Sequence, residues 1–558
     1  MSTDDRTDHP DTPEPNPDYQ PQDVGIDRRS FLVRLGAAGA AGAAVAALPP
    51  IAGRTAHAAP NSGTPFADVV RPEARTDPTE CTISEAATLI KSGKLKPSTL
   101  IGAYLERIAK WDPQYYQAYN TVLYDEASQR ALKLDRTKYI GPLHGVGIGL
   151  KDNFYTEGIL TTANSYIFAD FVPDYDCTAL TRLENAGAVL LGKCQMGPLA
   201  GGRPTTPDGT VTTRNPWAPN DPSVTPSGSS GGSGAATAGR LATCTLGTQT
   251  GGSITGPGGS NGLTALKPTH GRLSVYGIIP LTITRDHIGP LARTAMDAAI
   301  VAQVVGGPDL NDPRTIGLPP MPDLVEAATP VVKKGRVVPR WPTRVGVIPG
   351  YTTGTNATAL ARVAMLNTLA NIGFEVVDIT LPDEFSLLTG GAFNVSSSER
   401  AEIDFKYLKQ DVRLFGGRLT GWLPSIVQGG PEVAKGLRAR LLLIDRCMSQ
   451  MFNQCDVVMQ TGSTFDGIGL PLCTYLIGFA PNAAGISLPI TSVLGGPPFS
   501  EERMLSVIAA YQAVTTWHNR RPADPLVSSA KSRIAPTRIT CRDVDRECRA
   551  AMEGSEIV

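Results

Sequence analysis

Serine and glycine dominate residues 225–259, whose sequence is TPSGSSGGSGAATAGRLATCTLGTQTGGSITGPGG. This composition suits a flexible linker, but a linker stays polar and low in sequence information. Here Ala, Leu and Cys side chains follow at the spacing of a helix and then of a buried strand. The stretch therefore predicts an ordered scaffold whose glycines hold serine hydroxyls where chemistry can happen.

A phosphate-binding loop is one alternative for this scaffold. Such a loop requires a Gly-Lys-Ser/Thr sequence after its glycines, because the lysine contacts the phosphates. The run GSSGGSGAA has no lysine at that place. The pattern thus disfavours nucleotide binding, and the serine hydroxyls remain the groups of this scaffold that could do chemistry.

A serine nucleophile needs a base to take its proton. Past residue 58 the histidines are His144, His270, His287 and His518. Lysine is the other known solution, although its pKa of about 10.4 in water means that burial must first favour the neutral amine.

Lys151 is the candidate for such a lysine. It ends the apolar, glycine-rich run GVGIGLK, which predicts a short buried strand. The competing interpretation is a surface charge or an ion pair with Asp152, the next residue. On residue types alone, that interpretation is the commoner one for a lysine at a strand end.

The surrounding elements predict an α/β protein. Helical spacing, a serine cap and a proline in the first turn predict helices in SEAATLIKSG and PSTLIGAYLERIAKWDP, within residues 77–139. Helix, glycine and strand follow one another around Gly187 and again around Gly373. This alternation predicts a central mixed sheet flanked by helices on both faces.

The composition is that of a large globular chain. Of the 558 residues, 41% are hydrophobic and 18% charged, which allows a substantial core. The 51 basic and 52 acidic residues give a formal charge of −1, so no basic footprint for nucleic acid is present. The nine cysteines leave at least one thiol unpaired. Cys541 and Cys548 are candidates for a disulfide, and Cys177, Cys194 and Cys244 for buried small hydrophobic side chains.

The N-terminal segment resembles a twin-arginine export signal. Residues 1–27 are acidic and proline-rich, and Arg28 and Arg29 precede a weakly apolar run over residues 35–48. That run is shorter than the roughly 20 residues that span a bilayer, and AHA at 56–58 offers a cleavage site. The pattern predicts export, already folded, by the twin-arginine machinery.

From this we expect a tail and signal in residues 1–58, a linker over 59–76 and a C-terminal tail over 521–558. The protein is then periplasmic or extracellular, with no membrane span after cleavage. An uncleaved amphipathic anchor is the alternative, disfavoured because the apolar run has no charged face. Residues 387–430 read as an insertion or lid, and the sequence indicates no oligomeric state.

Three motifs in series resemble the amidase signature family. The Ser/Gly-rich stretch is similar to the family's Gly-Ser-Ser-Gly-Gly-Ser and Gly-Thr-x-Thr-Gly-Gly-Ser-Ile signature. GPLHGVGIGLKDN is similar to its lysine motif, and GISLPITSVLGGPPFSEERMLSVIAAYQ to its closing strand and helix. The resemblance implies the amidase-signature α/β fold, one catalytic domain over residues 77–520, and amide hydrolysis without a metal or cofactor.

The family's catalytic triad falls on Lys151, Ser229 and Ser253. The two serines are 24 positions apart, the interval that the family keeps. The resemblance implies that Ser253 attacks the carbonyl and that neutral Lys151 acts as base through Ser229. It also implies a cis peptide bond between Gly228 and Ser229.

The resemblance assigns further roles around the triad. The backbone N–H groups of Thr250, Gly251, Gly252 and Ser253 are expected to bind the oxyanion. Supporting positions are expected at Gly228, Ser230, Ser233 and Thr248. His144 and His270 receive no base role and are expected to be structural.

Two departures from the family pattern concern the substrate. Thr255 stands where the family usually has arginine, and Gln249 where aspartate is frequent. The missing positive charge favours a neutral small-molecule amide, with water as the second substrate. An esterase or carbamate hydrolase with the same triad is the alternative. The export signal disfavours a component of a tRNA-dependent amidotransferase, and the intact triad disfavours a non-catalytic binding protein.

Overall fold

The computed structural model describes residues 70–392, 395–426, 430–460 and 464–525. The expected tail and signal, the linker up to residue 69, and the C-terminal tail from residue 526 lie outside these ranges, as do Cys541 and Cys548. No helix in the described ranges is long and apolar enough to cross a membrane.

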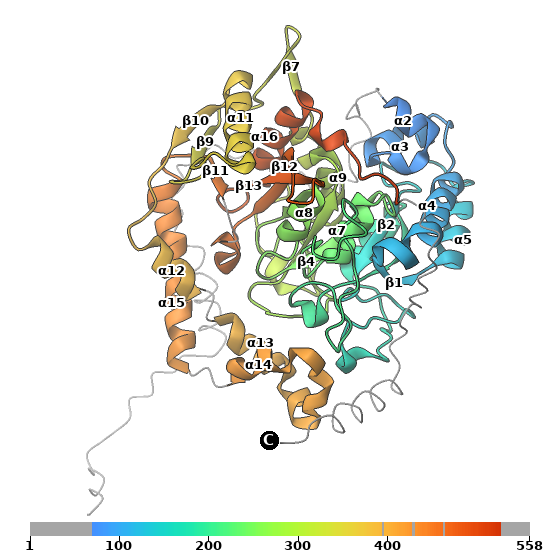
Figure 1. Cartoon of the computed structure of the whole chain (residues 1–558), viewed down its shortest axis with the longest axis horizontal. Helices are drawn as coiled ribbons and strands as arrows, with labels where there is room; N and C mark the ends of the chain where they lie inside the picture. The colour runs from blue at the N-terminus through green and yellow to red at the C-terminus, as the bar shows by residue number, and fades with distance from the viewer. Residues whose placement is uncertain (1–69, 393–394, 427–429, 461–463, 526–558) are drawn as a thin grey trace, which may run out of the picture. The chain divides into compact units, whose positions relative to one another are not determined.

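A mixed sheet of 11 strands forms the centre of the fold, as the alternation of helices and strands predicted (Figure 1). Its strand order is β1-β3-β2-β4-β6-β5-β12-β13-β11-β9-β10. β2 pairs in parallel with β3 and β4, and β9 with β10 and β11, whereas the other neighbours pair antiparallel. The strands are β1 (Tyr119–Val122), β2 (Gly147–Lys151), β3 (Val189–Cys194), β4 (Cys244–Gln249), β5 (Thr264–Lys267), β6 (His287–Ala292), β9 (Arg344–Val347), β10 (Glu375–Asp378), β11 (Val457–Gln460), β12 (Leu472–Pro481) and β13 (Ser487–Gly495).

Helices flank this sheet (Figure 1). They are α2 (Pro72–Thr76), α3 (Ile83–Lys91), α4 (Pro97–Trp111), α5 (Tyr124–Leu134), α6 (Thr178–Asn185), α7 (Gly231–Ala238), α8 (Thr255–Asn261), α9 (Ala295–Val305), α10 (Leu324–Ala327), α11 (Ala357–Ile372), α12 (Phe385–Ala392), α13 (Val395–Gln410), α14 (Leu419–Ile426), α15 (Gly430–Arg446) and α16 (Glu501–Ala513). Short 3-10 or π turns include η4 (Pro198–Ala200), η6 (Val412–Arg418) and η8 (Thr464–Ile468). A separate hairpin joins β7 (Val331–Lys333) and β8 (Arg336–Val338).

Local sequence signals account for several helix ends. α4 begins with Pro97 in its first turn, and α11 ends at Gly373, whose φ of 111° favours glycine. The serine cap expected for the first helix is wrong: α3 is capped by Thr82, two residues earlier. Thr82 Oγ1 accepts from the Glu85 N–H at 3.2 Å, and the Glu85 carboxylate accepts from the Thr82 N–H at 2.9 Å. This reciprocal pair satisfies two amides that a serine cap at position 84 would leave unpaired.

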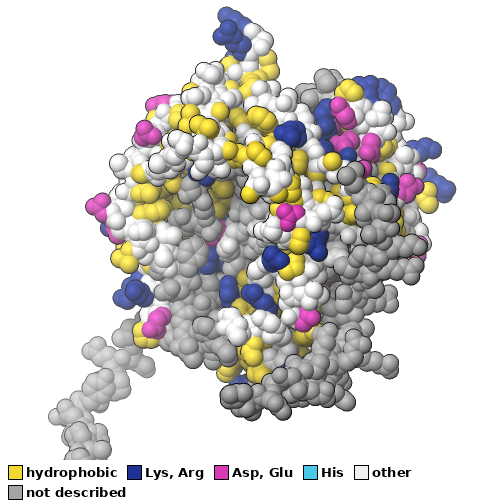
Figure 2. Space-filling model, viewed as in Figure 1, with side chains coloured by type: hydrophobic (Ala, Val, Ile, Leu, Met, Phe, Trp, Pro, Cys, Tyr) yellow, Lys and Arg dark blue, Asp and Glu magenta, His cyan; other side chains and the backbone are white. Residues whose placement is uncertain are grey.

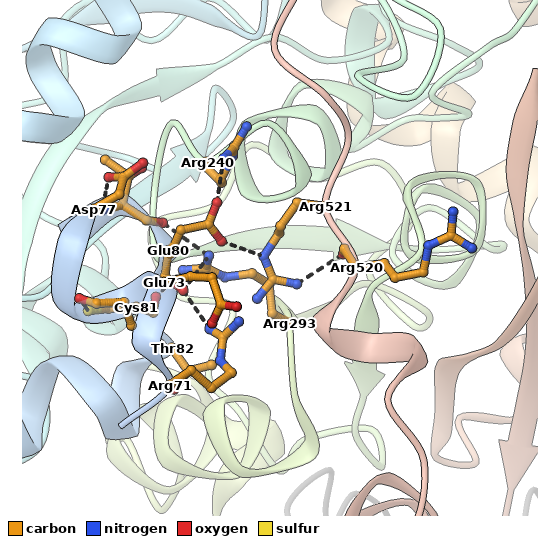
Figure 3. A network of polar contacts seen from close by, with 12 residues as sticks. Arg71, Glu73, Asp77, Glu80, Cys81, Thr82, Arg240, Arg293, Arg520 and Arg521 are labelled. Atoms are coloured by element: carbon orange, nitrogen blue, oxygen red, sulfur yellow. Dashed lines mark hydrogen bonds and ion pairs between the residues drawn. The ribbon is translucent and has the colours of Figure 1, made fainter. Parts of the chain in front are cut away.

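Buried polar contacts join the two ends of the described chain (Figure 3). The carboxylate of Glu80 accepts a hydrogen bond from Arg240 and forms an ion pair with Arg521 at 3.4 Å. Its backbone carbonyl accepts from Arg71 at 2.7 Å and from Arg293 at 3.3 Å. Glu80 is only 8% exposed, so these cations supply the charge compensation that its burial requires.

The segment expected as an insertion or lid is helical, comprising most of α12 and all of α13, η6 and α14. Its Phe415 and Trp422 pack in one apolar cluster with Met196 and Leu199, which come from the loop after β3. Between those two residues, the N–H of Gly197 donates to the carbonyl of Ser229 at 2.9 Å. The helical segment therefore rests on a loop that touches the predicted catalytic residues.

Acidic and basic side chains are scattered over the face seen in Figure 2. Basic side chains gather at the tip of the β7–β8 hairpin, where Lys333, Lys334 and Arg336 are exposed (Figure 2). Positive and negative side chains are therefore intermixed on this face, in agreement with the formal net charge of −1.

Candidate active site

Lys151 lies at the end of β2 and has no exposed surface. Its Nζ is 2.7 Å from Oγ of Ser229, 2.6 Å from Oγ1 of Thr248 and 3.3 Å from the carbonyl oxygen of Thr248. Burial lowers the pKa of Lys151 to about 7, and the negative charge of Asp286 opposes that shift. A neutral amine can donate its two N–H groups to the Thr248 oxygens and accept the Ser229 proton with its lone pair.

The competing interpretation of Lys151 was an ion pair with Asp152. In the structure, Asp152 pairs instead with another lysine. Nζ of Lys193, on β3, lies 3.4 Å from Oδ1 of Asp152. The other carboxylate oxygen of Asp152 accepts from the N–H and the hydroxyl of Thr162. Within the described residues Lys151 has no ion pair, so its amine remains directed at the two hydroxyls.

Ser229 stands two residues before the start of α7, and the Gly228–Ser229 peptide bond is cis, as the resemblance implied. A side chain at Gly228 would collide with the carbonyl of Gly202, so only glycine fits there. Ser230 binds the neighbouring strand and loop: its hydroxyl donates to the Thr248 carbonyl at 3.2 Å, and its N–H to the Ser253 carbonyl at 3.3 Å. These contacts bring the two predicted serine segments and Thr248 together.

The loop from Thr250 to Ser253 follows β4 and leads into α8. Gly252 has a φ of 94°, and Gly251 is exposed while Ser253 is partly exposed. Within the described residues, none of the backbone N–H groups at 250–253 donates a hydrogen bond. An accessible loop with free N–H donors can stabilise an oxyanion.

Two residues without a role predicted from the sequence hold this loop. Oε1 of Gln249 accepts from the N–H groups of Ile254 and Thr255 at 2.7 and 2.8 Å, and its Nε2 donates to Asp466 at 2.6 Å. The carboxylate of Asp286 accepts from the Thr250 hydroxyl. Gln249 stands out in the sequence only as a departure from the family pattern, and its position at the end of β4 is the signal that could have revealed its role.

The structure also shows the surroundings of the serine, histidine and cysteine residues that the sequence predicted to be structural. Ser233 donates its hydroxyl to the Leu246 carbonyl at 3.3 Å, a bracing contact. His144 is buried against the Leu134 carbonyl, and His270 packs edge-on against His287. Cys177, Cys194 and Cys244 are buried free thiols, as expected; the described cysteines that are free are Cys81, Cys177, Cys194, Cys244, Cys447, Cys455 and Cys473.

The fold and the sequence together define the class of protein. The Amidase family model matches residues 99–459, well over half of the chain, and the chain belongs to this family. It is therefore an amidase-type hydrolase acting on carbon–nitrogen bonds, with the amidase-signature α/β fold.

Particular relatives extend this assignment. The chain is 33% identical to a glutamyl-tRNA(Gln) amidotransferase subunit of Desulfatibacillum aliphaticivorans, over 79% of this chain and 99% of the relative. It is 34% identical to the subunit of the same name from Roseiflexus sp. strain RS-1, over 80% of this chain and 99% of the relative. Among solved structures, the peptide amidase of Stenotrophomonas maltophilia matches 83% of this chain and 99% of its own, with a TM-score of 0.68 and 26% identity.

Proposed function

We propose that the protein hydrolyses a carboxylic amide of a small molecule through an acyl-enzyme on Ser253, with Ser229 and Lys151 completing the triad. One observation carries the proposal: a fully buried lysine without an ion pair in the described ranges lies 2.7 Å from the Ser229 hydroxyl. Burial of an amine favours its neutral form, which can take a proton. A lysine with a purely structural task would instead pair with a carboxylate, as Lys193 does with Asp152.

In the first half-reaction the proton moves along the triad. Lys151 accepts the Ser229 proton, Ser229 accepts the Ser253 proton, and the Ser253 oxygen attacks the amide carbon. The tetrahedral oxyanion accepts hydrogen bonds from N–H groups at 250–253. When the C–N bond breaks, Ser229 donates a proton to the nitrogen and recovers one from Lys151, so a neutral amine or ammonia leaves.

In the second half-reaction water takes the place of the amine. The relay removes a proton from water, the resulting hydroxide attacks the acyl carbon, and Ser253 leaves with a proton returned through Ser229. Products are the carboxylic acid and free enzyme. Because an amine leaves poorly without a proton, the relay matters more for amides than for esters. An esterase or carbamate hydrolase remains the alternative with the same residues.

The relatives' name supports a second candidate, an amidotransferase subunit that acts together with partner proteins. Ammonia release by the purified chain alone argues for the small-molecule hydrolase, whereas release that requires added partner proteins argues for the second candidate. The expectation of a neutral substrate rests on a single position, Thr255. It takes no account of arginines in other segments of the chain.

The test uses a protein whose chain starts at Ala59. It is labelled with a serine-directed fluorophosphonate, and the labelled peptide is then mapped. We expect the label on Ser253 and its loss in Lys151→Ala. Labelling on another residue, or undiminished labelling without Lys151, contradicts the relay. Absence of labelling on a folded protein that also hydrolyses no amide, ester or carbamate would favour a non-catalytic binding protein.

We also propose export through the twin-arginine machinery, supported by Arg28 and Arg29 before the apolar run. Cell fractionation of the full chain and of an Arg28→Lys, Arg29→Lys variant tests this. We expect the first in the exported fraction, shortened near Ala59, and the variant retained. Retention of both in the cytoplasm contradicts the proposal.

A further inference from the structure

Two arginines of the helical segment lie half-buried without an ion pair in the described ranges. Arg400 is on α13, where its guanidinium lies over the ring of Trp422 at 5.2 Å, and Arg418 ends η6. Neither side chain makes a hydrogen bond with any residue of those ranges either. Arg413 of the same segment, by contrast, pairs with Asp411 at 2.6 Å.

Arg418 lies against the glycine loop next to the Ser229 segment, and Arg400 lies near enough to Asp286 for the charge of that carboxylate to raise the pKa of Arg400. A side chain at Gly201 would collide with the guanidinium of Arg418. The next residue, Gly202, packs its carbonyl against Gly228, which precedes Ser229. The two glycines therefore allow the Arg418 guanidinium to lie close to the backbone that supports the Ser229 segment.

The loop before β6, which contacts α13 through the hydrogen bonds of Thr284 to Glu399, adds a third guanidinium. A Cβ at Gly251, in the loop expected to bind the oxyanion, would lie 3.5 Å from Nη2 of Arg285. The pKa of Arg285 is lowered by burial, and the charges of Arg440 and Arg400 lower it further. Arg285 therefore adds a positive charge beside this loop, where the carboxylate of Asp286 accepts from the Thr250 hydroxyl.

The burial of these arginines is electrostatically unfavourable. Burial lowers the pKa of Arg400 and of Arg418, and the charge of Arg418 also lowers that of Arg400. The charges of Asp286 and Asp404 act in the opposite direction and raise the pKa of Arg400, but neither carboxylate forms an ion pair with it within the described residues. A half-buried cation without a partner costs free energy that a bound anion returns.

We propose that Arg400 and Arg418 bind an anionic group, a carboxylate, of the amide substrate. The planar guanidinium presents two parallel N–H donors that match the two oxygens of a carboxylate. This inference rests on the proposed function and names its substrate class as amides that carry a carboxylate. It replaces the neutral substrate expected from Thr255, because the positive charge comes from a different segment of the chain.

Matched substrates test the proposal. On the acyl side the pair is glutaryl and pentanoyl 4-nitroanilide, and on the amine side butyranilide with and without a 4-carboxylate. We expect the wild-type protein to prefer the carboxylate in at least one pair by tenfold or more in kcat/KM. Arg400→Gln and Arg418→Gln should each reduce that preference about tenfold and change kcat/KM for the neutral partner less than twofold.

Arg413→Gln is the matched control, since it removes the same charge from the same segment and its side chain is 55% exposed. It should keep the wild-type preference. Equal kcat/KM for both members of each pair, or equal losses in all three variants, overturns the inference while leaving the hydrolase intact.

Binding of glutarate separates this inference from the catalytic proposal. Isothermal titration should give a dissociation constant that rises about tenfold in Arg418→Gln and is unchanged in Arg413→Gln. Glutarate that binds in this way to a protein whose Ser253 is not labelled supports the anion site and contradicts the triad. If Ser253 is labelled but glutarate does not bind and substrates with a carboxylate are not preferred, the triad is supported and the anion site is contradicted.

Discussion

Oγ1 of Thr248 lies 2.6 Å from Nζ of Lys151, slightly closer to that amine than the Ser229 hydroxyl at 2.7 Å. The same threonine offers its carbonyl to both Lys151 and Ser230. Thr248 therefore fixes the direction of the lysine lone pair as well as the position of the turn that carries Ser229.

Replacing Thr248 by valine removes the hydroxyl and keeps the branched shape. A charged amine loses more from this than a neutral one, so the pKa of Lys151 should fall and its orientation should loosen. We expect kcat/KM for an amide to drop about tenfold. Steady-state kinetics checks this, and a Thr248→Ser variant that keeps the hydroxyl should retain most of the activity.

Ser229→Ala should separate amides from esters. The variant loses the group that returns a proton to the leaving nitrogen, whereas an alkoxide leaves more readily without one. We expect the ratio of amide to ester kcat/KM to fall by about tenfold or more, within the range typical of a general acid. An unchanged ratio would mean that the proton reaches the nitrogen by another route.

The activity should rise with pH through the pKa of Lys151, which is about 7. Below that pH the lysine is charged and cannot accept a proton, and above it the neutral base accumulates. The charge of Asp286 raises the pKa of Lys151, so Asp286→Asn should move the midpoint of kcat/KM to lower pH. Asp411→Asn, which removes an equal charge beside Arg413, should leave the midpoint in place.

Gln249→Ala should weaken the loop at 250–253. The variant leaves the N–H groups of Ile254 and Thr255 buried without an acceptor, at a cost of about 1–3 kcal/mol for each group. We expect lower stability in urea unfolding together with a lower kcat, because the oxyanion donors lose their support. The same substitution at the exposed Gln450 should alter neither quantity.

The sequence predicted the elements whose signals are local. The strand ending at Lys151, the helix–glycine–strand order around Gly187 and the helix before Gly373 all have their predicted form. Each of these predictions depends on the spacing of hydrophobic residues and on glycines that are close in the sequence. The cap of α3 was predicted wrongly although its signal is also local. Glu85 stands three residues after Thr82, which is the spacing of a capping box.

The contacts that a distant segment supplies could not be predicted in this way. Asp286 reaches Thr250 because β4 pairs antiparallel with β6 in a register that sets Gln249 opposite His287. Arg418 lies against Gly201 because aromatic side chains of its segment pack on the loop after β3. Neither register nor packing partner is encoded in a short motif.

The polar contacts around Glu80 also bear on the order in which the chain folds. Arg240 and Arg521, which compensate this carboxylate, are synthesised long after it, and Arg521 lies close to the end of the described chain (Figure 3). Until translation reaches Arg521, the segment before α3 holds a carboxylate with incomplete charge compensation. The N-terminal part of the domain thus reaches its final packing only when nearly the whole chain has left the ribosome.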